Sequence, residues 1–262
     1  MAEIVRVRNL NKHFRILERR AGLTGALALA FSPAFWSQTG GSESLNPAAI
    51  LAALDRPDVR VVGQGTRADQ SNGGIAADFA DTAAPRVLWD AALDALDGRI
   101  DVLINNAGVF EAAPIDLDDD EWVAAWERTM RINLTASAQL SRLAVRHWQA
   151  QGGGRLVNVA SRAAYRGDSP AHWHYAASKA GMIGMTKSIA RGYARENILA
   201  FAICPGFTMT GMAEEYLASR GGDKLLADIP LGRVANPDEV ATMARFCALE
   251  APPSMTGAVL DV

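Results

Sequence analysis

Residues 152–182 read GGGRLVNVASRAAYRGDSPAHWHYAASKAGM, and this stretch indicates the fold more directly than any other part of the sequence. The apolar run LVNV at 156–159 follows three glycines, which is typical of a buried strand. From Tyr175 onward, apolar residues recur at helical spacing, so Tyr175 and Lys179 are expected one turn apart on one helix face. The stretch therefore predicts a strand, a loop that begins near Ser161, and a helix.

These three polar residues suggest a site for carbonyl chemistry. A free tyrosine has a pKa of about 10, and a lysine ammonium a few ångströms away would favour the phenolate and lower that pKa. Tyr175 could then act as a general acid or base, while Ser161 donates a hydrogen bond to the same carbonyl oxygen. The alternative is that Tyr175 and Lys179 share a helix by chance, because their spacing alone is common.

Composition limits the possible classes of protein. The chain has 262 residues, 49% of them hydrophobic, which is enough for the core of one α/β domain. A net charge of −3 without a long basic run makes nucleic acid an unexpected partner. Cys204 and Cys247 lack the paired spacing of a disulfide framework or a metal site, so we expect no metal and a cytoplasmic location.

A basic and then apolar segment near the start of the chain resembles a secretory signal. Lys12 and Arg20 are among the basic residues that precede residues 21–36, AGLTGALALAFSPAFW. Ser32-Pro33 interrupts the apolar run, and no run in the sequence is long enough to span a membrane. We therefore expect neither export nor a membrane partner.

The region before residue 75 does not show the pattern expected of a nucleotide-binding unit. Residues 3–7 are compatible with a strand, and residues 25–31, GALALAF, with the start of a helix. A glycine-rich turn should lie between such elements, so that backbone amides can approach a pyrophosphate, but the sequence has none there. Gly63-Gln64-Gly65 follows a possible strand at 59–62, and we interpret it as a turn rather than a phosphate cradle.

Strands and helices alternate along the rest of the sequence. Besides 156–159, we expect strands at 77–79, 102–104 and 198–204, and a last strand from residue 258. This alternation predicts a doubly wound α/β fold, in which helices cover both faces of a parallel sheet within a single domain over residues 1–262. Asn105-Asn106-Ala107-Gly108 closes one strand, and alone it would be an ordinary turn.

The remaining segments leave alternatives open. A long helix is expected over 121–143, and its Asn133 is either a satisfied buried amide or a holder of a water that relays protons. Residues 212–228 are either a mobile substrate lid or a surface helix. Asn236 before Pro237 is expected to cap a helix.

Taken together, the motifs resemble the short-chain dehydrogenase/reductase family in its single-domain form. The resemblance covers about residues 75–262 and is nearest to the members called 3-oxoacyl-(acyl carrier protein) reductases. The motifs that carry it, in chain order, are Asn105 to Gly108, Asn133, Ser161, Tyr175 with Lys179, Pro205-Gly206 with Thr210, and LGRVANPDEVA at 231–241.

The resemblance implies a Rossmann-type fold, a nicotinamide cofactor and a small carbonyl or alcohol substrate. By resemblance, Tyr175 would donate and accept the proton, Lys179 would bind the nicotinamide ribose and lower the pKa of Tyr175, Ser161 would hold the substrate oxygen, and Asn133 would hold the relay water. The resemblance also assigns Asp78 and Phe79 to the adenine, Asn106, Ala107 and Gly108 to the adenosine side, and Pro205, Gly206, Thr208 and Thr210 to the nicotinamide carboxamide.

The sequence departs from the family pattern over about residues 9–41, where the glycine-rich turn is absent. The residue that would select NAD or NADP is therefore not identifiable, and the cofactor is expected to be NAD(P). A second hypothesis follows from this departure: a protein of the same fold that binds cofactor poorly and serves as a binding or assembly subunit.

The resemblance also implies a homodimer or homotetramer, formed through the helix around Asn133 and the helix after Tyr175. The substrate cannot be derived from the sequence. Four residues near the predicted trio are candidates for the substrate pocket, namely Arg162, His172, Trp173 and His174.

Overall fold

A computed structural model describes residues 26–29, 47–66, 74–209, 226–227 and 229–262. Within this described part, seven strands form one sheet in which every neighbouring pair is parallel. In sheet order the strands are β3 (Ile75–Ala76), β2 (Val61–Gly65), β1 (Ala26–Leu29), β4 (Val102–Asn105), β5 (Gly154–Val159), β6 (Ile198–Cys204) and β7 (Val259–Asp261). The chain therefore winds outward from β1 to β3 and then in the opposite direction from β4 to β7, which confirms the doubly wound fold.

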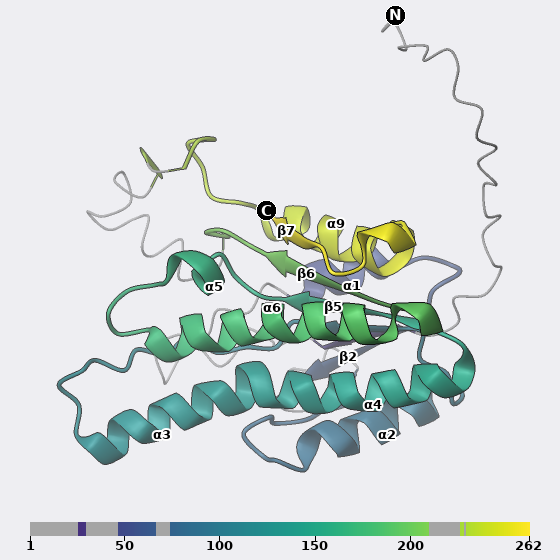
Figure 1. Ribbon diagram of the computed structural model, residues 1–262, viewed down its shortest axis with the longest axis horizontal. Coiled ribbons are helices and arrows are strands. Elements are labelled where there is room, and N and C mark those ends of the chain that lie inside the picture. The colour runs from purple at the N-terminus through teal and green to yellow at the C-terminus, as the bar shows by residue number, and fades with distance from the viewer. Residues whose placement is uncertain (1–25, 30–46, 67–73, 210–225, 228) are drawn as a thin grey trace, which may run out of the picture.

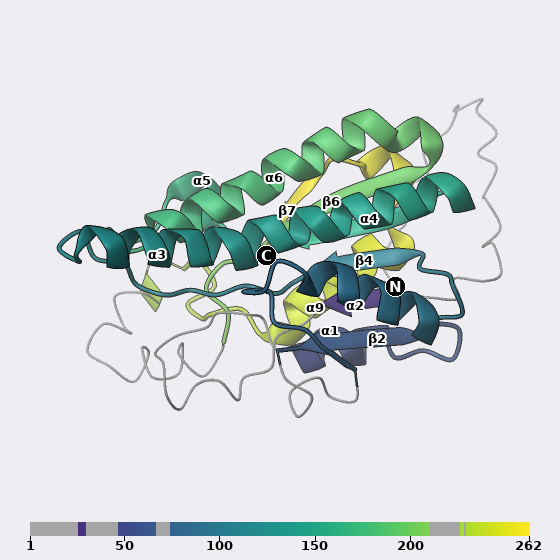
Figure 2. The ribbon, with the colours of Figure 1, turned by 90° about the horizontal axis from the view of Figure 1, so that it is seen from below.

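Helices cover both faces of the sheet (Figures 1 and 2). One layer contains α2 (Ala84–Ala95), α3 (Asp119–Met130), α4 (Ala136–Gln151) and α6 (Trp173–Tyr193), and the other contains α1 (Pro47–Leu54) and α9 (Pro237–Arg245). The shorter elements are the π-helical turn η3 (Arg131–Thr135), α5 (Ala163–Arg166), η4 (Ala194–Glu196), the π-helical turn η5 (Phe246–Glu250) and η6 (Pro253–Met255).

The hydrophobic core is divided by the sheet into two clusters. Leu103 and Leu156 point into the cluster beneath α2 and α4, whereas Ile104 and Val157, one position further along each strand, point into the cluster beneath α1 and α9. Successive strand residues face opposite sides, so strands covered on both faces must be apolar at every position. Residues 198–204 meet this requirement, since all seven are buried as predicted.

The sequence prediction was wrong at two places near the start of the chain. Residues 26–29, expected at the start of a helix, form β1, which pairs with β2 on one side and β4 on the other. A run of four small and apolar residues is too short to show helical or strand periodicity, so partners distant in sequence determine its conformation. Gly63-Gln64-Gly65, expected as a turn, lies within β2, and Gln64 donates a hydrogen bond to the Ala77 carbonyl oxygen at 2.6 Å.

Other predicted elements occur with shifted bounds. The strand expected at 77–79 is β3 at Ile75–Ala76, and the helix expected over 121–143 consists of α3, η3 and α4. The side chain of Asn236 caps α9 in a capping box with Glu239, as expected. The strand expected at 3–7 lies outside the described residues.

Two further observations concern composition. Cys204 and Cys247 are separate buried thiols, and burial raises the pKa of Cys247 to about 11. Of the helices in the described ranges, none combines the length and the hydropathy that crossing a membrane requires.

Gly154 at the start of β5 tests the packing between the sheet and α4. A β-carbon at Gly154 would lie 2.3 Å from indole atoms of Trp148, which is fully buried and donates a hydrogen bond to the Ile100 carbonyl oxygen at 2.8 Å. We expect Gly154→Ala to lower the free energy of unfolding by about 1–3 kcal/mol, because the indole must move in a filled core.

The matched control is Gly184→Ala, at an exposed position of α6 where a β-carbon would meet no atom within 4 Å. This change should raise the free energy of unfolding by up to about 1 kcal/mol, because alanine favours helix. Urea unfolding of both variants makes the comparison, and equal stabilities would contradict the packing described for Trp148.

Candidate active site

The residues expected to act together lie at one edge of the sheet. Asp78, Asn106, Ser161 and Pro205 each come shortly after the carboxyl end of a strand, namely β3, β4, β5 and β6. Because all strands are parallel, these ends meet at the same edge, where α5 and the beginning of α6 also lie (Figure 1). Ligands of open parallel sheets bind at this edge, next to the point where the strand order reverses, here between β1 and β4.

Lys179 is held against the end of β5 by its ammonium group. The Nζ atom donates a hydrogen bond to the Val159 carbonyl oxygen at 2.9 Å and lies 3.9 Å from the sulfur of Met182. The same atom lies 5.7 Å from the centre of the Tyr175 ring, and only 3% of Lys179 is exposed. The structure thus brings the ammonium and the phenol ring together. The acceptor of the ammonium, Val159, is two residues before Ser161.

Asn133 connects the loop after β4 to α6. It lies in the π-helical turn η3, where an extra residue per turn changes the direction of the side chains relative to a regular α-helix. The Asn133 amide accepts a hydrogen bond from the Val109 N–H at 2.8 Å and donates to the Val109 carbonyl oxygen at 3.0 Å and to the Ser178 Oγ at 3.2 Å. Both amide hydrogens are therefore donated to protein atoms, as expected for a satisfied buried amide.

Ser178 was not identified from the sequence. It is fully buried, accepts the hydrogen bond from Asn133, and donates one to the Tyr175 carbonyl oxygen at 2.7 Å. The chain of contacts from Val109 through Asn133 and Ser178 thus reaches the turn of α6 that carries Tyr175. The available signal was a serine directly before Lys179 and one turn after Tyr175.

A second set of buried polar contacts lies behind this one. Asn105 donates to the Asn158 side chain at 2.8 Å and to Ser141 at 3.1 Å, and Asn158 donates to Thr186 at 2.8 Å. These contacts join β4 and β5 to α4 and α6 inside the protein, where buried hydrogen-bond networks make one arrangement specific. Asn105 is therefore the last residue of β4, with its side chain buried inside the protein, and the loop begins at Asn106.

Ser161 lies two residues before α5 and remains partly accessible. Its Oγ accepts a hydrogen bond from the Ala163 N–H at 3.1 Å, which orients the side chain at the carboxyl end of β5. An accepted hydrogen bond leaves the hydroxyl its own hydrogen, which can be donated to a carbonyl oxygen.

The residues assigned to the adenosine side differ in how they face the solvent. Asp78 is exposed, and its carboxylate accepts a hydrogen bond from the Ala80 N–H at 2.9 Å. Phe79 is 1% exposed and packs in the core, so its ring does not line a surface site. Gly108 lies beside the catalytic candidates, because a β-carbon there would be 3.4 Å from both the Asn133 Oδ1 and the Lys179 Nζ.

The residues that the resemblance assigns to the nicotinamide carboxamide lie in the loop after β6. The Pro205 carbonyl oxygen accepts a hydrogen bond from the Arg162 N–H at 3.1 Å, Gly206 donates to the Val262 carbonyl oxygen at 2.8 Å, and Thr208 donates to Gly206 at 3.3 Å. Thr210 lies outside the described residues, as does the segment expected at 212–228 apart from Leu226 and Ala227.

The four candidate pocket residues are not equivalent. Arg162 places its guanidinium over the ring of Phe207 at 5.2 Å, Trp173 is 54% exposed, and His174 is buried with its ring facing Trp126. His172 stacks on a ring that in turn contacts Tyr175. That ring belongs to Phe110, which was not identified from the sequence and contacts the Tyr175 ring at 4.8 Å between centres.

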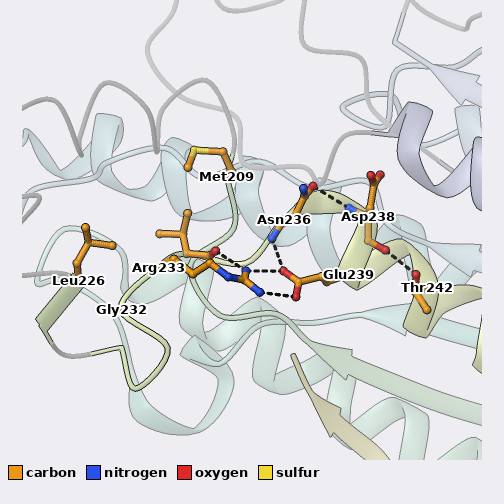
Figure 3. A pocket seen from close by; sticks show the side chains of 9 residues that line it. Met209, Leu226, Gly232, Arg233, Asn236, Asp238, Glu239 and Thr242 are labelled. Carbon is orange, nitrogen blue, oxygen red and sulfur yellow. Dashed lines mark hydrogen bonds and ion pairs between the residues drawn. The ribbon is translucent and has the colours of Figure 1, made fainter.

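A separate pocket of about 620 Å³ lies between the loop after β6 and the start of α9 (Figure 3). Arg233 donates to both oxygens of Glu239 at 2.8 and 2.9 Å, and this pairing holds the pKa of Glu239 at about 2. The residues that line the pocket are Met209, Leu226, Gly232, Arg233, Val234, Asn236, Asp238, Glu239 and Thr242. The four predicted catalytic residues are not among these lining residues, so the pocket as described is separate from the catalytic candidates.

The Asn133 contacts give a prediction about stability. We expect Asn133→Ala to lower the free energy of unfolding by about 2–4 kcal/mol, because the buried Val109 backbone groups and Ser178 lose their partner. The control is Ser137→Ala, one turn further along, which removes a single hydrogen bond to the Asn133 carbonyl oxygen. Chemical denaturation should show a loss of no more than about 1 kcal/mol for the control, and similar losses in both variants would refute the role given to Asn133.

Comparison with known proteins shows the family to which the chain is similar. A family model described as enoyl-(acyl carrier protein) reductase matches residues 49–262. The 3-oxoacyl-[acyl-carrier-protein] reductase FabG of Thermotoga maritima is 38% identical over 166 residues, which span 63% of this chain and 65% of that relative. The match thus covers slightly less than two thirds of the relative's length.

Two further proteins extend the comparison. A short-chain type dehydrogenase/reductase of Sinorhizobium fredii, itself uncharacterized, is 31% identical over 72% of this chain and 74% of its own length. A crystal structure from Beutenbergia cavernae, assigned as an NAD(P) dependent gluconate 5-dehydrogenase with bound NADP at low occupancy, superposes with a TM-score of 0.74 at 28% identity, covering 92% of this chain and 96% of that one. With its sheet order, its edge of strand ends and these matches, the chain belongs to the short-chain dehydrogenase/reductase family.

Proposed function

We propose that this protein is an NAD(P)-dependent oxidoreductase that interconverts a carbonyl and an alcohol by hydride transfer. The observation that carries the proposal is the position of the Lys179 ammonium, bound to the end of β5 and 5.7 Å from the Tyr175 ring centre. Family membership supports the same reaction class. The substrate expected is a small molecule.

In the proposed reaction, Tyr175 and Lys179 handle the proton. During reduction, the Tyr175 hydroxyl gives its proton to the substrate oxygen, and the phenolate that remains is stabilised by the nearby ammonium. Ser161 donates a hydrogen bond to the same oxygen and so favours the charge that develops there. When bound, the nicotinamide cofactor supplies or accepts the hydride at the substrate carbon.

The side chains present suit the nicotinamide half of such a cofactor. Lys179 offers a donor for the ribose, Gly108 keeps the space beside Lys179 and Asn133 free of a side chain, and the backbone around Pro205 and Gly206 faces the same edge. For the adenosine half, Asp78 offers an exposed carboxylate, Phe79 only its backbone, and Asn106 and Ala107 line the end of β4. The NADP reported for the Beutenbergia cavernae protein makes NADPH the first cofactor to test.

The relay role of Asn133 is retained in a restricted form. Because its amide hydrogens are donated to Val109 and Ser178, we assign Asn133 chiefly to positioning α6, and a relay water there would have to be bound by an oxygen of Asn133. Reduction of a 3-oxoacyl group is the finer form of the proposal, and the similarity to FabG of Thermotoga maritima supports it. A homodimer or homotetramer through α4 and α6 is proposed from the family and can be measured by light scattering.

The assignment of Tyr175 predicts a specific loss of turnover. Tyr175→Phe should lower kcat by at least about 100-fold with any accepted carbonyl substrate, because the proton donor is gone while the ring packing is kept. Tyr165→Phe is the matched control, since Tyr165 is 56% exposed on α5 and should keep wild-type rates. Retained turnover in Tyr175→Phe would contradict the assignment.

Cofactor titration separates the proposal from the second hypothesis of a binding or assembly subunit. Fluorescence titration of the full chain with NADPH and NADH should give a micromolar Kd for at least one of them. Gly108→Val should weaken that Kd about tenfold or more, equivalent to about 1.4 kcal/mol, because added methyl groups would crowd Lys179 and Asn133.

The control for this titration is Gly184→Val, on the exposed part of α6, which should leave the Kd unchanged. If neither nucleotide binds below millimolar concentration, the subunit hypothesis is favoured instead.

A further inference from the structure

The ring of Tyr175 borders a wall made by Phe110 and His172, which we call the aromatic wall. Phe110 meets Tyr175 edge to face, with ring centres 4.8 Å apart and an interplanar angle of 87°. His172 stacks on Phe110 at 3.8 Å and 3°. Both residues are only half-buried, so the wall remains in part accessible.

Two segments distant in sequence are joined to form this wall. Phe110 lies in the loop between β4 and α3, and His172 directly precedes α6. The Ala113 N–H donates to the Ala171 carbonyl oxygen at 2.8 Å, which ties the two segments together. The His172 Nδ1 also lies 2.6 Å from the Ser169 Oγ, so the orientation of the imidazole is fixed.

Further rings support the wall from behind. The His174 ring is 6.3 Å from that of His172 at an angle of 9°, and Trp126 lies 6.4 Å beyond His174 at 28°. A backed wall of this kind keeps its shape when a ligand arrives, so it can select ligands by fit.

The wall presents rings rather than charges. Burial lowers the pKa of His172, against a smaller opposing effect of Asp168, and so favours the neutral form of the imidazole. The nearby carboxylates have other partners, since Glu111 is paired with Arg128 at 3.3 Å and Asp168 accepts a hydrogen bond from the Ser169 N–H at 2.7 Å. The surface next to Tyr175 on this side therefore presents uncharged rings.

A substrate whose oxygen meets the Tyr175 hydroxyl must place the groups on its reacting carbon beside the neighbours of Tyr175. We propose that Phe110 and His172 determine specificity, and that the substrate carries an apolar group, a ring or an unbranched chain, next to its carbonyl rather than a run of hydroxyl groups. This inference rests on the proposed function and narrows its substrate class. A polyhydroxylated substrate would lose hydrogen bonds with water on this side, and the Phe110 ring would offer it no polar partner.

Three ketones of different character test the inference on the full chain with NADPH and NADH. Acetophenone represents the ring, 2-octanone the unbranched chain, and erythrulose the polyhydroxylated class. We expect kcat/KM for at least one apolar ketone to exceed that for erythrulose about tenfold or more, and the ratio between the first two distinguishes ring from chain. Equal or higher kcat/KM with erythrulose would overturn the inference while leaving the proposed function intact.

Variants then test the two residues. Phe110→Ala should lower kcat/KM for the preferred apolar ketone about five- to tenfold and change that for erythrulose less than about twofold. His172→Phe should keep the preference because the stack is retained, whereas His172→Ala should reduce it. Tyr165→Ala is the matched control, since Tyr165 is an aromatic residue of α5 that is 56% exposed, and it should leave the preference unchanged. A uniform loss for all ketones in Phe110→Ala would show a structural role only.

A binding measurement keeps the inference testable if no ketone is turned over. Ligand-observed NMR on the full chain compares 1-phenylethanol and 2-octanol with erythritol, in wild type and in Phe110→Ala. Binding of an apolar alcohol to the wild type that is lost in the variant supports the wall, even where failure to bind NADPH has refuted the proposed function. Equal binding of all three alcohols, or none, would overturn it.

Discussion

The hydrogen bond between the Lys179 ammonium and the Val159 carbonyl oxygen is the interaction on which the site depends. A buried ammonium is costly unless its hydrogens are donated to protein acceptors, and Lys179 is 3% exposed. The acceptor at 2.9 Å is the last residue of β5, so the charge can be held only when this strand and α6 are both in place. The position of the ammonium beside Tyr175 is thus a property of the sheet and helix together.

The polar groups behind this contact set the distance between strand and helix. Asn133, in a π-helical turn, binds both backbone groups of Val109 and passes a hydrogen bond through Ser178 to the backbone of Tyr175. Buried amides and hydroxyls with complete sets of partners favour a single arrangement over near alternatives. The long helix therefore has an irregular turn where a regular one would have directed Asn133 elsewhere.

Features with strong local patterns were predictable from the sequence. The apolar run at 198–204, the helix cap at Asn236 and the sharing of a helix face by Tyr175 and Lys179 all appear in the structure. Features that depend on distant partners were not predictable. The short β1 is a strand because β2 and β4 hydrogen-bond to it, and Phe110 is notable only because His172 and Tyr175 lie against it. Ser178 was not predictable because its partner, Asn133 in η3, is distant in sequence.

The order of the strands has a consequence for how the chain assembles. β4, β5 and β6 and the helices between them come from one continuous stretch, 102–204, which contains Tyr175, Lys179, Ser161 and Asn133. β1, by contrast, joins β4 across 72 intervening residues that separate Leu29 from Val102. The contacts within 102–204 join segments that are near one another in sequence. The pairing of β1 with β4 instead joins segments that are far apart in sequence, and such contacts form more slowly. The lysine, tyrosine and serine therefore have a framework that is local in sequence, whereas the strand at the reversal point is held by partners that are distant in sequence.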